Sequence, residues 1–185
     1  MKKKMLATML TIFVATQMMV AVHAVDFVDP QDCQTKYFSG QYKIGQDIPA
    51  GEYVIFPSET NRKGFYFETL DANGDNYDDT GSVVTNGIVM LDEGNYIELD
   101  HAYAIPIEEN PTVDTTGEGT FKVGYHIDAG EYKVSQIDTS KHGFYFVFKD
   151  STKESYAASD SFDGSVYVSV SDGQVLELSN AKLEK

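Results

Sequence analysis

The chain repeats itself, and this repeat limits its fold more than any other feature. The stretch Ile48-Pro49-Ala50-Gly51-Glu52-Tyr53 returns 79 positions later as Ile127-Asp128-Ala129-Gly130-Glu131-Tyr132. At the same spacing, Gly64-Phe65-Tyr66-Phe67 matches Gly143-Phe144-Tyr145-Phe146. The sequence therefore predicts one small module that is present twice.

Apolar residues in the two copies alternate with a period of two. For example, Tyr53 and Ile55 match Tyr132 and Val134. This alternation is typical of strands with one buried face, and turn sequences such as Asp172-Gly173 separate the apolar runs. We therefore expect an all-β protein made of two tandem, small antiparallel β-sandwich modules, with a jelly-roll arrangement as one form of that sandwich.

The N-terminus has the pattern of a signal peptide. The basic stretch Lys2-Lys3-Lys4 precedes a mostly apolar run from Leu6 to Val20, and Val22-His23-Ala24 offers small residues at a cleavage site. The predicted division is a signal peptide at 1–24, an N-terminal tether at 25–39, a first module at 40–107, a linker at 108–118 and a second module at 119–185. We expect a secreted, extracellular or cell-surface-associated protein whose mature form has no membrane span.

The charge of the chain excludes several classes of partner. The formal net charge is −15, and loss of the three leader lysines makes it −18. Phosphate backbones and anionic membranes are bound mainly through Lys and Arg, so nucleic acid is not an expected partner. The only cysteine, Cys33, lies outside both copies, and an internal disulfide cannot form.

The repeated residues also carry a resemblance. The pattern G-x-x-I-x-A-G-E-Y, followed by G-F-Y-F and by Leu176-Glu177-Leu178 in the second copy, resembles the small tandem β-modules of exported proteins from Gram-positive bacteria. The resemblance implies an exported β-protein. Because the shared residues belong to turns and core positions, it transfers no active site.

Acidic residues found in both copies invite a comparison with glycosidases. Glu52 matches Glu131, and Glu98 matches Glu177. Paired carboxylates could act as acid and base, but these residues alternate with apolar ones, so outer, solvated strand positions are the expected account. No catalytic residues are assigned, and we expect a protein that is not an enzyme.

Tyrosines offer one candidate ligand-binding site. In the G-F-Y-F strands the phenylalanines are expected to point inward, so that Tyr66 and Tyr145 point outward on equivalent strands. They could stack against a glycan or a peptide. A half-buried tyrosine with only its hydroxyl at the surface is the alternative.

An acidic loop in the first copy offers a candidate calcium site. Oxygen-bearing side chains alternate through Asp71, Asn73 and Asp75 and are followed by Asp78 and Asp79. Hard cations such as calcium take ligands of this kind, although the loop departs from the EF-hand pattern. An ordinary acidic turn is the alternative, and no other cofactor is expected.

One outer face of the first copy is unexpectedly apolar. The residues Val54, Phe56, Ile88, Met90 and Tyr96 occupy predicted outward positions, where the second copy has more polar residues. A contiguous apolar patch usually marks a contact surface. We expect this face to be covered by the second module, by the segment 25–39 or by a partner.

Together these features predict a secreted, non-catalytic binding or adhesion protein that recognises an extracellular protein or glycan. Two alternatives stay open. One is a small secreted hydrolase that uses surface carboxylates. The other is a structural or inhibitory module that caps another exported protein.

Overall fold

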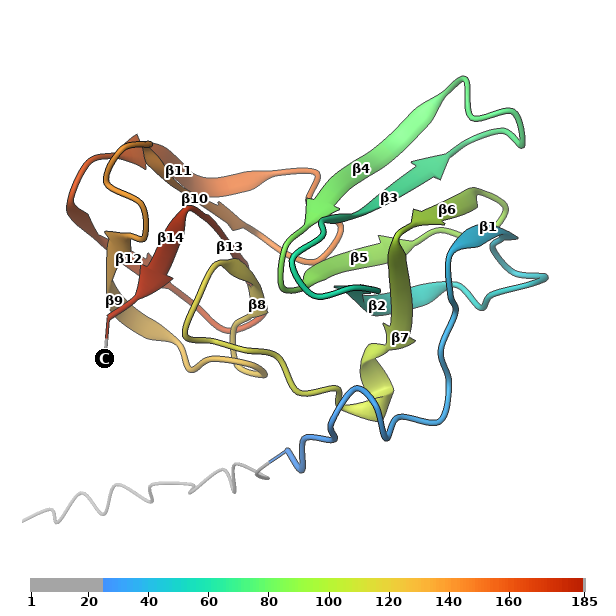
Figure 1. Cartoon of the computed structure of the whole chain (residues 1–185), viewed down its shortest axis with the longest axis horizontal. Helices are drawn as coiled ribbons and strands as arrows, with labels where there is room; N and C mark the ends of the chain where they lie inside the picture. Colours follow the sequence, from blue (N-terminus) through green and yellow to red (C-terminus); the bar gives the residue numbers. More distant parts are fainter. Residues whose placement is uncertain (1–24, 185) are drawn as a thin grey trace, which may run out of the picture.

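The structure is a computed structural model that describes residues 25–184, so the predicted signal peptide lies outside the described residues. The protein is all-β, and its strands form two modules that lie side by side (Figure 1). The first module contains β1 (Gly40–Lys43), β2 (Gly51–Pro57), β3 (Gly64–Thr69), β4 (Tyr77–Val83), β5 (Gly87–Leu91), β6 (Tyr96–Asp100) and β7 (Ala102–Pro106), followed by the short 3₁₀ helix η1 (Ile107–Glu109). The second contains β8 (Gly119–Lys122), β9 (Gly130–Gln136), β10 (Gly143–Phe148), β11 (Tyr156–Phe162), β12 (Ser165–Val170), β13 (Val175–Ser179) and β14 (Ala181–Leu183).

The sequence repeat is also a structural repeat. Every strand of the second module except β12 begins 79 positions after its counterpart, and β12 begins one residue earlier than that spacing requires. Each module has a four-stranded and a three-stranded antiparallel sheet, with orders β1-β6-β3-β4 and β5-β2-β7 in the first module and β8-β13-β10-β11 and β12-β9-β14 in the second. The strand pairs β1-β6, β2-β5 and β3-β4 alternate between the two sheets, which is a jelly-roll-like connection.

The core of each module lies between its two sheets. In the first module, Tyr53 and Ile55 from the three-stranded sheet meet Ile97 and Leu99 from the four-stranded sheet, and all four are at most 2% exposed. In the second module, Phe121 is fully buried in the matching cluster. The predicted period-two alternation therefore identifies the inner faces of these strands correctly.

The G-F-Y-F strands β3 and β10 are exceptions, because they have the opposite orientation to the predicted one. Tyr66 is 2% exposed within the first core, whereas Phe65 is 36% exposed. Likewise, Tyr145 packs against the second core, and Phe144 is 39% exposed. Three consecutive aromatic residues leave period-two alternation unable to say which of them is buried.

Residues 25–39, which the sequence analysis described as a tether, lie against the first module. The Val28 N–H donates to the Asn110 carbonyl at 2.8 Å, and Tyr37 pairs with Ala104 of β7. Between these two attachments, Cys33 is buried in an apolar cluster with Val54 of β2. The segment therefore forms part of the folded first module.

Candidate functional site

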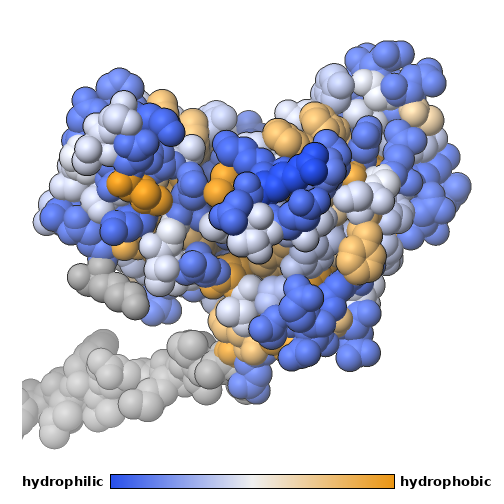
Figure 2. Space-filling view, in the orientation of Figure 1, coloured by the Kyte–Doolittle hydropathy of each residue, from blue (hydrophilic) through white to orange (hydrophobic). Residues whose placement is uncertain are grey.

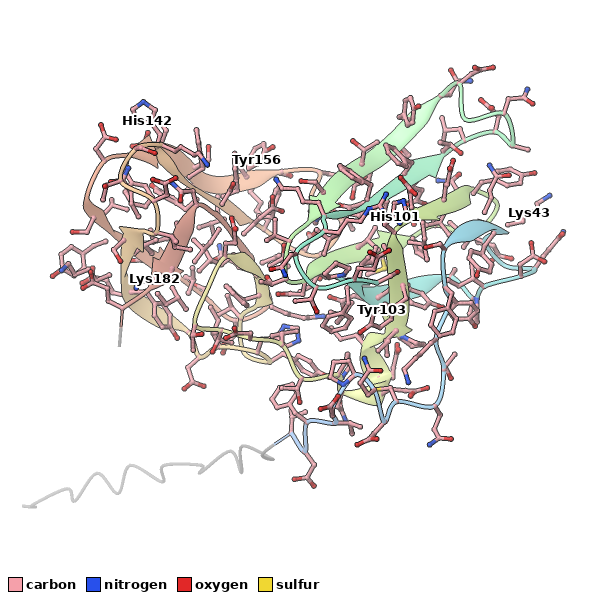
Figure 3. The ribbon with its side chains drawn as sticks, viewed as in Figure 1. Lys43, His101, Tyr103, His142, Tyr156 and Lys182 are labelled. Atoms are coloured by element: carbon pink, nitrogen blue, oxygen red, sulfur yellow. The ribbon has the colours of Figure 1, made fainter. Side chains whose placement is uncertain are left out.

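A cleft of about 410 Å³ lies between the two modules. On one side, the consecutive residues 79–82 of β4 line it, and on the other side β10 and β13 do. Figure 2 shows the surface dipping between the two modules, and Figure 3 shows Tyr156 on the side of the second module that faces the first. Aromatic and charged side chains from both modules line the cleft: Lys63, Tyr66, Asp79, Glu118, Phe146, Phe148, Lys153, Tyr156 and Glu177.

Lys153 joins the two walls of the cleft. Its side chain is 9% exposed, and its ammonium lies 3.9 Å from Asp79 Oδ2 and 3.9 Å from Glu177 Oε2. It also donates a hydrogen bond to the Tyr66 hydroxyl at 2.9 Å. A nearly buried ammonium is stable only where anionic and polar partners replace its lost water, and this site supplies three of them.

Tyr66 reaches the cleft from inside the first module. Its hydroxyl donates to Asp79 Oδ2 at 3.1 Å while accepting the bond from Lys153. Burial, followed by the charge of Asp79, holds the pKa of this phenol well above its usual value, so the group stays protonated as a donor. Gly81 on β4 makes room for the ring, since a Cβ there would overlap it. In the second module Asp160 replaces Gly81, and Tyr145 packs instead near Phe162.

The second module supplies an aromatic wall. The ring centroids of Phe146 and Phe148 are 6.3 Å apart, and those of Phe148 and Tyr156 are 4.8 Å apart. These rings occupy the outer face of the four-stranded sheet, and Tyr156 is 55% exposed. Such rings offer a ligand a large apolar contact area, and because aromatic side chains have few rotatable bonds, little side-chain freedom is lost on binding.

Further polar contacts hold the modules together beside the cleft. Glu52 of β2, which the sequence placed on a solvated face, is 8% exposed and accepts hydrogen bonds from Lys122 and Ser151 of the second module. The Asn86 side-chain amide donates to the Thr120 carbonyl in the same region. The cleft walls are therefore fixed relative to each other by direct hydrogen bonds between the two modules.

The predicted partner-contact face divides into two parts. Val54 and Phe56 are 0% and 8% exposed, under a cover that includes Cys33 and Tyr125 of the second module, and Ile88 is also fully buried. Met90 lies beside Glu52 on the same sheet and is partly exposed.

Tyr96 requires a correction to this face. It lies on β6 in the four-stranded sheet, with the Lys43 ammonium 5.5 Å from its ring centre, and so does not belong to the apolar face. Adjacent strands β5 and β6 lie in different sheets, and alternation along the chain gives no sign of that change.

The residues of the predicted calcium loop do not converge on one point. Asp71 accepts hydrogen bonds from the Asn73 and Asp75 N–H groups and from the Asn76 amide, which closes the loop on itself. Asp79 faces Lys153, on the cleft side.

Asp78 instead approaches two acidic residues that the sequence analysis did not single out. Glu68, Asp78 and Asp92 bring three carboxylates within 4.8 Å of one another. Glu68 is 1% exposed, and burial raises the pKa of its carboxyl to about 7, although bonds from the Asp92 N–H and from Asn95 act in the opposite direction. Among the described residues, this trio brings together carboxylate oxygens of the kind that could hold a metal ion.

Sequence reasoning missed most residues of the cleft. Phe146 was expected to point inward, and Lys153 and Tyr156 were not predicted, because the packing of β4 against the second module leaves no local sequence pattern. One signal was present: Lys153 replaces Gly74 of the first copy. A charged residue gained by only one copy indicates a contact that only that copy makes.

Comparison with models of protein families, with curated proteins and with solved structures finds no match to the chain. Within residues 25–184, no helix is long and apolar enough to cross a lipid bilayer. The function must therefore be argued from the cleft itself.

Proposed function

We propose that this is an exported, non-catalytic binding protein that holds an extracellular protein or glycan ligand in the cleft between its modules. The observation that carries the proposal is the cleft of about 410 Å³, whose walls combine aromatic rings with a few converging polar groups. Ligand sites commonly have this composition, and they commonly lie between domains. The leader pattern and the negative charge are consistent with a role outside the cell.

The geometry favours binding over hydrolysis. Asp79 and Glu177 are the carboxylates that face each other across the cleft, and both are directed to the same ammonium of Lys153. A glycosidase needs one carboxyl group to give a proton and another to attack or to activate water. Two carboxylates that share a buried cation between them are suited to holding a structure or a ligand.

The test uses one exposed tyrosine in the cleft and one outside it. Tyr156 lines the cleft, whereas Tyr167 is 66% exposed on β12 and is not among the residues that line it. We expect Tyr156→Ala to weaken ligand binding roughly tenfold and Tyr167→Ala to leave it unchanged. Glycan arrays and surface pull-downs from the producing cell identify ligands, and the dissociation constant of each hit is then measured for both variants.

Three outcomes contradict this proposal. If Tyr156→Ala and Tyr167→Ala weaken ligand binding equally, the ligand does not bind in the cleft. Turnover in a hydrolase substrate panel that disappears in Asp79→Asn or Glu177→Gln would indicate an enzyme. A stoichiometric complex that blocks the activity of another exported protein, and that survives Tyr156→Ala, would indicate an inhibitory cap.

A further inference from the structure

We propose that the cleft recognises the ammonium group of a lysine side chain in an extended basic peptide, and that Lys153 occupies the same site from within when no peptide is bound. The inference rests on the proposed binding function and names the ligand class. Its first support is the surroundings of the Lys153 ammonium, which form a complete receptor for such a group.

Residues from both modules build that receptor. Besides its two carboxylate partners and the Tyr66 hydroxyl, the ammonium lies 5.4 Å from the ring centre of Tyr66 and 5.8 Å from that of Phe148. Aromatic faces attract cations, most strongly where water is partly excluded. Carboxylates and ring faces together select a cation on an apolar stem over a neutral group.

The second support is the strand that borders the cleft. β4 is the last strand of its sheet, paired only with β3 among the described strands. Because the consecutive residues 79–82 all line the cleft, the edge of β4 itself faces it. Extended peptides commonly bind by adding a strand to such an edge, with alternate side chains entering neighbouring pockets.

The charge of the protein selects a basic peptide for this edge. Asp79, Glu118 and Glu177 line the cleft against Lys63 and Lys153, and the whole chain carries a net charge of −15. Once Lys153 is displaced, three acidic lining residues face one basic one, so the charge of an incoming peptide lysine is compensated. Long-range attraction would also speed the encounter with a basic partner.

Lys153 is placed so that it can be displaced. It lies in the loop between β10 and β11 and is therefore on a connection and not within a strand. Its φ of 56° is unusual for a lysine, and the matching Gly74 also has a positive φ of 75°. Lys153 competes with any lysine ligand for the same site. Only molecules in which Lys153 has left the site can bind the ligand, so the apparent affinity falls in proportion to the fraction of free sites. Removal of Lys153 should therefore increase peptide affinity.

The experiment measures peptide binding to the whole chain without its leader. The probe is a hexapeptide of alternating lysine and threonine, with an acetyl-lysine version as the uncharged control. We expect the wild-type protein to bind the lysine peptide and to bind the acetylated one at least roughly tenfold more weakly. Lys153→Met, which keeps the stem and removes the ammonium, should tighten the lysine peptide by on the order of tenfold.

A matched substitution controls for a change in overall charge. Lys149 is exposed and is the first residue of the same loop, so Lys149→Met removes one positive charge without emptying the receptor. It should not change the affinity for either peptide. Glu177→Gln should weaken the lysine peptide and spare the acetylated one.

Several results would overturn the inference. The first is that the lysine and acetyl-lysine peptides bind equally well. The second is that neither the wild type nor Lys153→Met binds the lysine peptide at millimolar concentration. The third is that Lys153→Met and Lys149→Met gain the same affinity for the lysine peptide. A larger radius of gyration for Lys153→Met in solution scattering would show that Lys153 is a strut between the modules. If a glucosamine oligosaccharide binds and the peptide does not, the ligand ammonium that the cleft recognises belongs to a sugar and not to a lysine. A neutral ligand that is lost in Tyr156→Ala would preserve the proposed function while rejecting lysine recognition.

Discussion

The outer faces of the two three-stranded sheets differ, although the sheets have the same strand order. In the first module, Val54 of β2 is fully buried beneath the N-terminal segment and residues of the second module. Its counterpart in the second module is Lys133, which forms an exposed ion pair with Glu184. Figure 3 shows Lys182 of β14 on the side of the second module that lies away from the first.

This difference shows that the repeat contains two kinds of position, those of the sandwich core and those of a contact surface. Positions that stay apolar in both copies, such as Ile55 and Val134, belong to the sandwich itself. Positions that are apolar in one copy and polar in the other, such as Val54 and Lys133, depend on what covers that copy. Comparison of copies within one chain therefore distinguishes core positions from contact positions without any relatives.

Exchanging the contact residues between the copies should have the largest effect. Val54→Lys places the second-module residue in the first module, where an ammonium would be buried without a partner, and we expect unfolding to become easier by roughly 4 kcal/mol. The reciprocal Lys133→Val should change stability little, since it alters an exposed position. Urea unfolding of both variants provides the measurement. Similar losses in the two would mean that the faces are equally covered.

Glu52 and Glu131 give a second, smaller contrast. Glu52 accepts bonds from Lys122 and Ser151, whereas Glu131 is exposed. We expect Glu52→Ala to destabilise the protein by about 2 kcal/mol because it leaves Lys122 and Ser151 without their shared acceptor. Glu131→Ala serves as the control and should be nearly neutral in thermal unfolding. An unchanged Glu52→Ala protein would show that this contact does not hold the modules together.

Glu68 and Val147 are matched buried residues that should differ in their response to pH. The pKa of Glu68 is raised to about 7 by burial, above its ordinary 4.5, so the folded state favours the neutral acid. Its stabilising contribution is therefore complete below pH 4.5 and is lost as the pH rises through about 7. Glu68→Gln should remove this loss and gain on the order of 1 kcal/mol relative to wild type at pH 8. Parallel pH curves for the two proteins would contradict the assignment.

Calcium binding is where we expect the smallest measurable difference between the two modules. The trio Glu68, Asp78 and Asp92 corresponds to Val147, Ala157 and Ser171 in the second module, which offers no matching carboxylates. If the acidic loop region of the first module binds calcium, titration calorimetry should give one weak site, which Asp78→Asn reduces. The absence of heat at millimolar calcium would reduce the region to an acidic turn. Heat that Asp78→Asn leaves unchanged would place the ion elsewhere.

The sequence predicted two modules because the repeat is visible at a constant spacing, and it predicted most inner faces because these follow local alternation. Tyr66 shows where that reasoning fails. A tyrosine is expected to keep its hydroxyl in water, but here the hydroxyl finds Asp79 and Lys153, so the ring can enter the core. The stacked pair Phe65 and Phe67 remains outside, with ring centres 6.5 Å apart.

The cleft could not be predicted because it depends on how two complete modules pack. Lys153 and Asp79 are far apart in sequence and belong to different copies, so neither alternation nor spacing relates them. The apolar outer face could be predicted, since Val54 and Phe56 are apolar at positions where the second copy has polar residues. Its membership was partly wrong, because Tyr96 lies in the other sheet.

The burial of Cys33 gives the protein a built-in chemical reporter. Cys33 as a residue is 6% exposed, and burial, followed by the charge of Glu109, raises the pKa of its thiol, so the reactive thiolate is scarce while the N-terminal segment covers it. A thiol reagent can therefore modify the chain only as fast as the N-terminal segment lifts from β2. Because this is the sole cysteine, each molecule is modified once, and the labelling rate reports how readily the N-terminal segment opens.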